Sequence, residues 1–290
     1  MIYNGLHISE NGTLRYYDGF ASSVTIPDSV TKICDSAFSG CKSLESVTIP
    51  NSVTEIGWSA FFSCESLQSI EIPNSVTKIC DSAFSGCKSL ESVTIPASVK
   101  KTGCAVFSGC ANLRSVEIQD GVTYIATEAF SDCKSLESVT IPDSVKWIGH
   151  SAFYGCKALK TVVIPNGVTQ INEDTFYGCK SLESITIPNS VFWIGRRAFS
   201  GCEALKTVVI PNGVTKIKED TFYGCKSLEN VTIPDSVNWI GASVFAGCSS
   251  LQNIRIPASA CWIDDRKISD IEEDEYAYYE DLYEDLYSDE

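Results

Sequence analysis

Residues 136–158 read LESVTIPDSVKWIGHSAFYGCKA, and this pattern recurs every 23 residues along most of a chain of 290 residues. A fixed period of 20–50 residues is typical of solenoids, in which each unit buries its apolar face against its neighbours. The repeat therefore predicts one elongated body rather than two globular domains. Three columns keep the spacing without a slip: Phe38 to Phe245, Cys41 to Cys248 and Leu44 to Leu251.

A single unit predicts a mainly β turn of the solenoid. Leu136, Val139 and Ile141 have the spacing of a strand with one inward apolar face, and Ser138 and Thr140 are expected to point outward. Pro142 lacks an N–H group and ends that strand. Residues 145–148 supply a second inward pair, and residues 152–156 are expected to form a short helical or 3₁₀ return. We therefore predict a repeat solenoid of short parallel strands joined by turns and such returns.

The pattern LxxVxIPxxVxxIxxxAFxxC closely resembles the BspA-like leucine-rich repeats of bacterial and protist surface proteins, over residues 21–263. The resemblance implies a leucine-rich-repeat stack and a role in adhesion to host cells or matrix at a microbial surface. It also implies a cell-surface or secreted location. Residues 1–5, however, show neither the basic nor the apolar stretch of a signal peptide.

Four segments are predicted along the chain. Residues 5–18 read as a β-hairpin with a turn at Asn11-Gly12, which would cap the open N-terminal end of the core. The repeat signature fades after Pro257. We therefore expect a hairpin cap at 1–20, a leucine-rich repeat solenoid at 21–263, a degenerate C-terminal cap at 264–271 and an acidic, tyrosine-rich tail at 272–290.

The net charge of −15 is concentrated at one end of the chain. Asp270 to Glu290 contains eleven acidic and no basic residues, which leaves about −4 for the rest. A body without a basic stripe does not favour nucleic-acid binding. No stretch has the ~20 apolar residues of a membrane-spanning helix. The expected partner is a host-cell or matrix protein, with a glycan as an alternative, and the oligomeric state is left open.

Catalytic chemistry has little support in the sequence. The two histidines, His7 and His150, lie about six repeats apart, and there is no phosphate loop, HExxH motif or nucleophile elbow. We predict a non-enzymatic protein with no catalytic residue, cofactor or metal site.

The fourteen cysteines are better explained by packing than by disulfides or zinc. Ten of them stack once per repeat with parallel side chains, whereas a disulfide needs converging ones. No CxxC cluster of the kind that binds zinc occurs. We predict a column of buried free thiols. Four cysteines outside the column are candidates for reactivity: Cys34, Cys80, Cys104 and Cys261.

One column changes character along the chain. The position two residues after the second inward valine is charged in the first half and largely aromatic in the second. Aligned tryptophans suggest a surface for protein or glycan, because tryptophan is enriched in binding hot spots. Alternatively, each ring lies flat over its neighbour and only shields the backbone. The candidate partner-binding residues are Tyr124, Trp147, Phe192, Trp193, Trp239 and Trp262.

The tail supplies a rival hypothesis. Tyr276, Tyr279, Tyr283 and Leu286 have the spacing of one helical face. The tail is either a disordered solubilising segment, a segment that docks on a partner or on the solenoid end, or a substrate. In the third case the protein is an intracellular or delivered effector whose tail is modified by a tyrosine-modifying enzyme. The candidate modification sites are Tyr279, Tyr283 and Tyr287.

Overall fold

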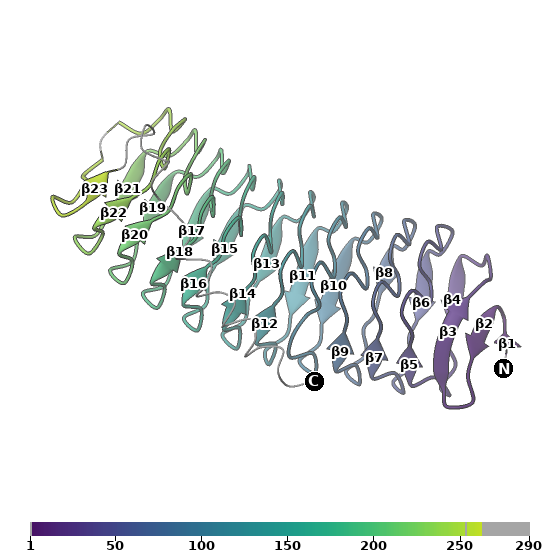
Figure 1. The fold of residues 1–290 in the computed structure, drawn as a ribbon. Helices are drawn as coiled ribbons and strands as arrows, with labels where there is room; N and C mark the ends of the chain where they lie inside the picture. The colour runs from purple at the N-terminus through teal and green to yellow at the C-terminus, as the bar shows by residue number, and fades with distance from the viewer. Residues whose placement is uncertain (1, 253, 263–290) are drawn as a thin grey trace.

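The computed structural model describes residues 2–252 and 254–262, which form a stack of similar turns beginning with an N-terminal hairpin (Figure 1). Most repeats contribute one strand to each of two rows. The first row is a parallel sheet of ten strands, in which equivalent residues of neighbouring repeats pair, such as Val93 with Val116. Its strands are β4 (Ser23–Thr25), β6 (Ser46–Thr48), β8 (Ser69–Ile70), β10 (Ser92–Ile95), β11 (Ser115–Ile118), β13 (Ser138–Thr140), β15 (Thr161–Val163), β17 (Ser184–Thr186), β19 (Thr207–Val209) and β21 (Asn230–Thr232).

The second row consists of two-residue strands, which follow the proline turn of their repeat in every case except β12. It is divided into shorter sheets because neighbouring strands do not always pair. Its strands are β5 (Lys32–Ile33), β7 (Glu55–Ile56), β9 (Lys78–Ile79), β12 (Tyr124–Ile125), β14 (Trp147–Ile148), β16 (Gln170–Ile171), β18 (Trp193–Ile194), β20 (Lys216–Ile217), β22 (Trp239–Ile240) and β23 (Cys261–Trp262).

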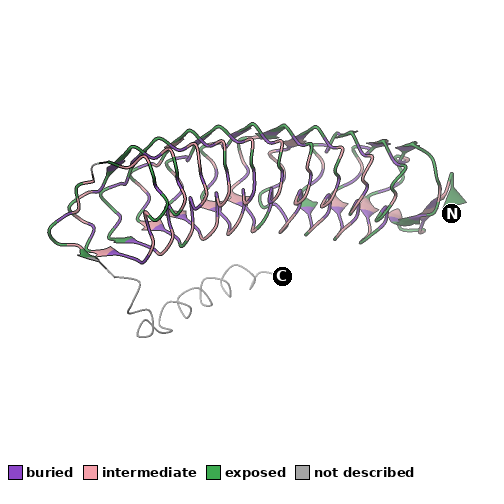
Figure 2. Cartoon of the chain, turned by 90° about the horizontal axis from the view of Figure 1, so that it is seen from above, coloured by how far each residue is buried: buried purple, intermediate pink, exposed green. Residues whose placement is uncertain are grey.

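The apolar columns form one continuous core inside the turns. Phe38 to Phe222 are completely buried, and successive phenylalanine rings stack at 4.9–5.8 Å between centroids, within 12° of parallel. Figure 2 shows the buried segments on the inner side of the turns and the exposed ones on their outer edges. The predicted mainly β leucine-rich-repeat solenoid is therefore confirmed.

The return segments are turns, so the predicted helical or 3₁₀ returns are wrong. In the repeat at 149–156, Tyr154 N–H donates to Ser151 O within the turn, but Phe153 N–H donates to Thr175 O of the next repeat. Ser151 also has φ of 52°, outside the right-handed helical region. Alternate amides are thus committed to the neighbouring turn, and a continuous helical ladder cannot form.

Two departures from the repeat pattern have local structural effects. Gln119 replaces the proline, and its N–H donates to Ile95 O at 3.0 Å, next to the longer strands β10 and β11. Thr102 replaces the second-row isoleucine and is buried, and its hydroxyl accepts from Ala126 N–H at 2.9 Å. At that repeat the second row has only an isolated bridge between Lys101 and Tyr124 within the described residues.

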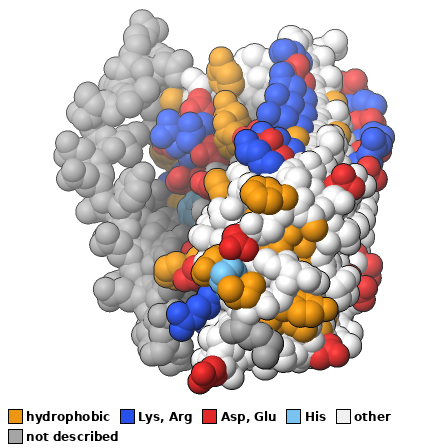
Figure 3. Space-filling view, turned by 90° about the vertical axis from the view of Figure 1, so that its right-hand side faces the viewer, with side chains coloured by type: hydrophobic (Ala, Val, Ile, Leu, Met, Phe, Trp, Pro, Cys, Tyr) orange, Lys and Arg blue, Asp and Glu red, His pale blue; other side chains and the backbone are white. Residues whose placement is uncertain are grey.

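An antiparallel hairpin lies at the N-terminal end of the stack. It is built from β1 (Ile2–Tyr3), β2 (Leu6–Ile8) and β3 (Thr13–Tyr17), and β3 pairs in parallel with β5. Leu6 and Leu14 are fully buried, and the Tyr17 ring lies 5.3 Å from that of Phe38. Figure 3, which views this end, shows hydrophobic side chains scattered among polar ones.

The described chain ends at Trp262. The predicted C-terminal cap at 264–271 and tail at 272–290 lie outside the described residues. Across residues 2–252 and 254–262, no helix reaches the length and apolarity that crossing a membrane requires.

Candidate functional site

The aromatic residues predicted to bind a partner lie along the second row of strands. Tyr124, Trp147, Trp193 and Trp239 each open a two-residue strand whose isoleucine points into the core, and all four are half-buried. We call these four residues the aromatic row. Phe192, beside Trp193, is 50% exposed. The structure therefore places five of the six predicted residues on one edge of the solenoid.

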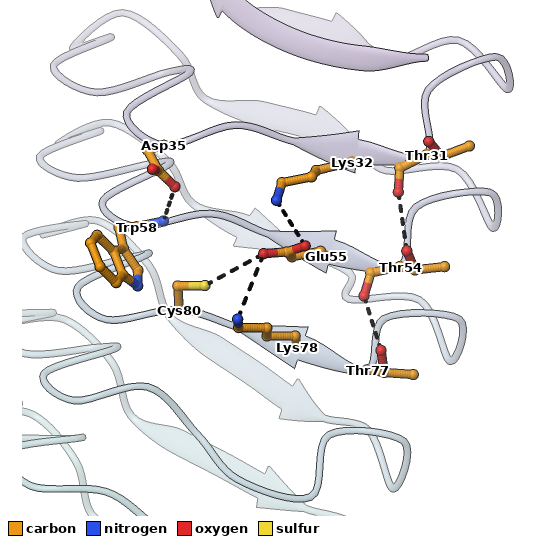
Figure 4. A network of polar contacts seen from close by, with 9 residues as sticks. All are labelled: Thr31, Lys32, Asp35, Thr54, Glu55, Trp58, Thr77, Lys78 and Cys80. Carbon is orange, nitrogen blue, oxygen red and sulfur yellow. Dashed lines mark hydrogen bonds and ion pairs between the residues drawn. The ribbon is translucent and has the colours of Figure 1, made fainter. Parts of the chain in front are cut away.

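The N-terminal part of the same column carries charges instead. The Lys32 ammonium lies 2.9 Å from one oxygen of Glu55, and that of Lys78 lies 3.9 Å from the other (Figure 4). The Cys80 thiol, 4.0 Å from Glu55, is buried, and burial raises its pKa to about 11. Cys80 is therefore a poor candidate for the predicted reactivity.

The C-terminal part of the row encloses a lysine. The Lys218 ammonium lies 4.5 Å from the centroid of the Trp193 ring and 5.4 Å from that of Trp239, and the residue is 8% exposed. A cation over an aromatic face is stabilised by the ring quadrupole, by about 0.5–2 kcal/mol. At the other end of the row, Tyr124 and Trp147 stack on each other with centroids 6.1 Å apart.

An alternation of glycine with larger residues makes room for this arrangement. Gly195 and Gly241 come two residues after Trp193 and Trp239, whereas Lys218 occupies that position in the turn between them. A Cβ on Gly241 would lie 2.9 Å from Cη2 of Trp239, so the indole covers the glycine of its own repeat. The glycine thus frees the space in which the ring approaches Lys218.

Two nearly identical copies of the sequence differ only at this site. Residues 160–183 and 206–229 match at every position except 170/216 and 172/218. The earlier copy has Gln170 and Asn172 there, and the later copy has Lys216 and Lys218. The two copies keep every other residue and differ only in having two neutral amides in one and two lysines in the other.

The earlier copy contains polar atoms without partners. Asn172 is 1% exposed and donates from its amide nitrogen to Ile148 O at 2.6 Å. Its Oδ1 and the Oε1 of Gln170 are buried and have no hydrogen-bond partner among the described residues. A buried acceptor left unpaired costs about 1–3 kcal/mol. The two unpaired oxygens therefore reduce the stability of the structure between Trp147 and Trp193.

Trp262 does not continue the aromatic row. Its 23-residue spacing places it after Trp239, but in β23 Cys261 pairs with Trp239 and Trp262 pairs with Ile240. The pairing register of β23 is thus shifted by one residue from the 23-residue spacing. By this pairing, the aromatic row ends at Trp239 within the described strands.

A hollow on the strand face was not predicted from the sequence. This hollow, of about 800 Å³, crosses β8 to β13 and is lined mainly by polar side chains. Glu71 and Glu117 lie in it two repeats apart, and Thr94 between them donates to Glu117 at 3.4 Å. Single outward Ser and Thr residues carry no signal, because the hollow arises only when the repeats are stacked.

Titratable groups near the row include a half-buried histidine and an ion pair. His150 is half-buried instead of fully exposed, and burial lowers its pKa, although Glu173 and Asp174 oppose this. Burial raises the pKa of Asp174, against the opposing effect of Arg197 at 2.8 Å. Within the described ranges, no three His, Cys, Asp or Glu side chains converge as metal ligands would.

The cysteine column is built into the core. From Cys64 to Cys248 each thiol is buried and donates to the carbonyl of the phenylalanine 26 residues earlier, at 3.1–3.3 Å. Burial raises the pKa of Cys133, Cys156 and Cys179 well above its usual value. Cys261 is exposed.

Comparison with known protein families identifies the repeat as a leucine-rich repeat. The family described as "BspA type Leucine rich repeat region" matches residues 14–137 and 169–272, in six copies. No curated protein matches the chain.

The predicted modification sites lie outside the described residues; they are Tyr279, Tyr283 and Tyr287.

Two solved structures resemble this one over most of its length. A leucine-rich repeat protein from T. pallidum is 31% identical, with a TM-score of 0.52, over 69% of this chain and 86% of that one. A leucine-rich cell surface protein from Faecalibacterium prausnitzii is 28% identical, with a TM-score of 0.50, over 91% and 93%.

Proposed function

This chain belongs to the BspA-type leucine-rich repeat family, and from that premise we propose that it is a microbial surface scaffold that binds a host-cell or matrix protein. Members of this family are repeat scaffolds. The Faecalibacterium relative is a cell surface protein, which supports a surface location for this chain as well. The proposed protein is non-enzymatic and acts by presenting a rigid face.

The observation that carries the proposal is the aromatic row. Trp147, Trp193 and Trp239 lie two repeats apart on one edge, each half-buried, with the half-exposed Phe192 beside them. Partly exposed aromatic rings on a rigid backbone supply contact area at little cost in conformational entropy. The hollow on the strand face is mostly polar and has no comparable anchor.

The test compares capture of partners by three versions of the full chain, from host-cell lysate and from extracellular matrix. Trp147→Ala with Phe192→Ala removes two aromatic side chains of this edge and leaves Lys218 between its two rings. Val163→Thr with Val209→Thr alters the strand face at two valines that are 64% exposed, and serves as the matched control. We expect the edge variant to lose at least about tenfold in affinity, since two anchors contribute more than 1.4 kcal/mol.

Other outcomes would redirect the proposal. If the control loses the partner and the edge variant keeps it, the strand face is the binding surface. Capture that disappears on enzymatic deglycosylation of the lysate would identify a glycan. Recovery of the chain from host cells with Tyr279, Tyr283 or Tyr287 modified, together with no capture by either face, would favour the effector hypothesis.

A further inference from the structure

We propose that the acidic tail of this chain, residues 272–290, docks in cis on the C-terminal part of the aromatic row, around Lys216, Lys218, Trp193 and Trp239. The inference concerns the same edge as the proposed function but needs no external partner. It would make the row a self-covered surface, which a partner reaches only in competition with the tail.

The chemistry of the surface fits an acidic, tyrosine-containing peptide. Lys216 and Lys218 place two cations in one turn, and the indole rings of Trp193 and Trp239 flank Lys218. Ammonium groups pair with carboxylates, and indole rings pack against phenol rings. Two carboxylates of this region pair with arginines: Asp220 lies 3.8 Å from Arg196, and Asp174 lies 2.8 Å from Arg197.

The tail has the complementary composition. Asp270 to Glu290 carries eleven acidic residues, no basic one and five tyrosines. The body of the chain is nearly neutral, so net charge alone does not direct the tail to any place on it. The local pair Lys216 and Lys218, set among aromatic rings, distinguishes this turn from its copy at Gln170 and Asn172.

The described chain ends beside this surface. β23 is the third strand of the sheet β20-β22-β23, so the last described residues lie two strands from Lys216, which is about 10 Å. The 28 residues that follow would span about 90 Å if extended and about 40 Å at helical rise. Either length allows the tail to reach the row without strain.

The first experiment is zero-length carbodiimide coupling of carboxylates to amines in the full chain, read by mass spectrometry. An equal mixture of ¹⁴N- and ¹⁵N-labelled protein separates coupling within one chain from coupling between two. We expect tail carboxylates to couple to Lys216 or Lys218 within one chain. Coupling only between differently labelled chains would replace the cis contact with a second copy, and coupling only to lysines elsewhere would overturn the proposal.

The second experiment measures hydrogen exchange of the tail in full-length variants. Lys216→Gln with Lys218→Asn recreates the residues that the earlier copy already accommodates, so this variant should fold. Lys42→Gln with Lys88→Gln removes the same charge from exposed lysines at the other end and is the control. We expect the first variant to speed tail exchange about tenfold, a loss of 1.4 kcal/mol, and the control to leave it unchanged.

Docking of the tail should also depend on salt concentration. Contacts between partly exposed charges weaken as ionic strength rises, so protection of the tail should fall between 0.05 and 0.5 M salt. Tail exchange as fast as in the isolated peptide of residues 268–290, or equally slow in both variants, would refute docking at the lysines. Neither result affects capture of a partner by the aromatic row, so the two proposals fail separately.

Discussion

Lys218 and Asn172 occupy the same position in two nearly identical copies of the sequence, yet their side chains make different contacts. The lysine places its ammonium between two indole rings, and the asparagine donates to a carbonyl and keeps an unpaired oxygen. Residue type alone predicts that a lysine is exposed, and this one is not. The signal that could have found it is the pair of differences between otherwise identical copies, read together with the glycines two residues after each tryptophan.

The buried thiols should make the free energy of unfolding fall as the pH rises in the alkaline range. Because burial raises the pKa of Cys133, Cys156 and Cys179, these thiols stay protonated in the fold at pH values where the unfolded chain loses its protons. Their contribution is complete below the unfolded pKa of about 8.5 and is lost as pH rises through and above it, by about 1.4 kcal/mol per pH unit for each thiol.

We therefore expect Cys156→Ala with Cys179→Ala to reduce the slope of unfolding free energy against pH above about pH 9. Urea denaturation between pH 7 and 10.5, with a reductant present, measures it. The variant will be less stable at neutral pH because it contains two cavities, so the comparison concerns slopes. Cys261→Ala, at an exposed thiol, is the control and should keep the slope of the unchanged chain. Parallel curves for all three proteins would contradict burial of the column.

At the scale of the element, close approach of successive turns decides which residues are tolerated. Gly195 has its backbone against the neighbouring turn, where a Cβ would lie 2.6 Å from the backbone nitrogen of Glu173. Gly178 instead has φ of +67°, and a Cβ there would approach its nearest neighbour at 3.9 Å. The first glycine is required by space, and the second by backbone conformation.

These two glycines give a matched pair of substitutions. Gly195→Ala should cost about 3 kcal/mol or more, because two backbones must move apart. Gly178→Ala should cost about 1–2 kcal/mol, the penalty for a left-handed alanine with room for its methyl group. Chemical denaturation of both variants checks the order. Equal losses would mean that the turns separate more easily than the contact distance implies.

The strands and the core could be predicted from the sequence, whereas the return turns and the pairing register of β23 could not. Strands and core columns were predictable because a 23-residue period repeats their apolar positions ten times. The returns were predicted as helical or 3₁₀ from residues such as Ala152, Phe153 and Cys156. In the structure Ser151 takes a positive φ, although the sequence has no glycine at that position to indicate it. The shift of Trp262 was hidden for a similar reason, since spacing in sequence does not fix the register of pairing.

At the scale of the whole molecule, stability comes from contacts between neighbouring turns. In such a stack an internal unit can be removed if its neighbours can meet again, whereas an end cap has no substitute. Leu159 is followed by residues 160–183, and removing residues 160–205 joins it to their near-identical copy at 206–229. The hairpin at residues 2–17 buries Leu6 and Leu14 and covers Phe38.

We expect deletion of residues 1–20 to be more damaging than deletion of residues 160–205, although it removes fewer residues. The first leaves apolar columns facing water and should lead to association or loss of the folded state. The second should give a shorter monomer that unfolds cooperatively. Light scattering and thermal unfolding, followed by circular dichroism, compare the two. If the deletion of residues 160–205 prevents folding while the deletion of residues 1–20 leaves a stable monomer, the hairpin is not the essential cap.

The ladders that join one turn to the next have a mechanical consequence. Hydrogen bonds such as Phe153 N–H to Thr175 O connect consecutive turns, and therefore run along the long axis of the stack. A pull on the two ends loads the junctions in series, so each carries the full force and the weakest yields first. Among the described residues, second-row pairing is interrupted around Thr102, between β14 and β16, and between β18 and β20. A chain anchored at one end and held by a partner at the other is therefore expected to lengthen first at one of these interruptions.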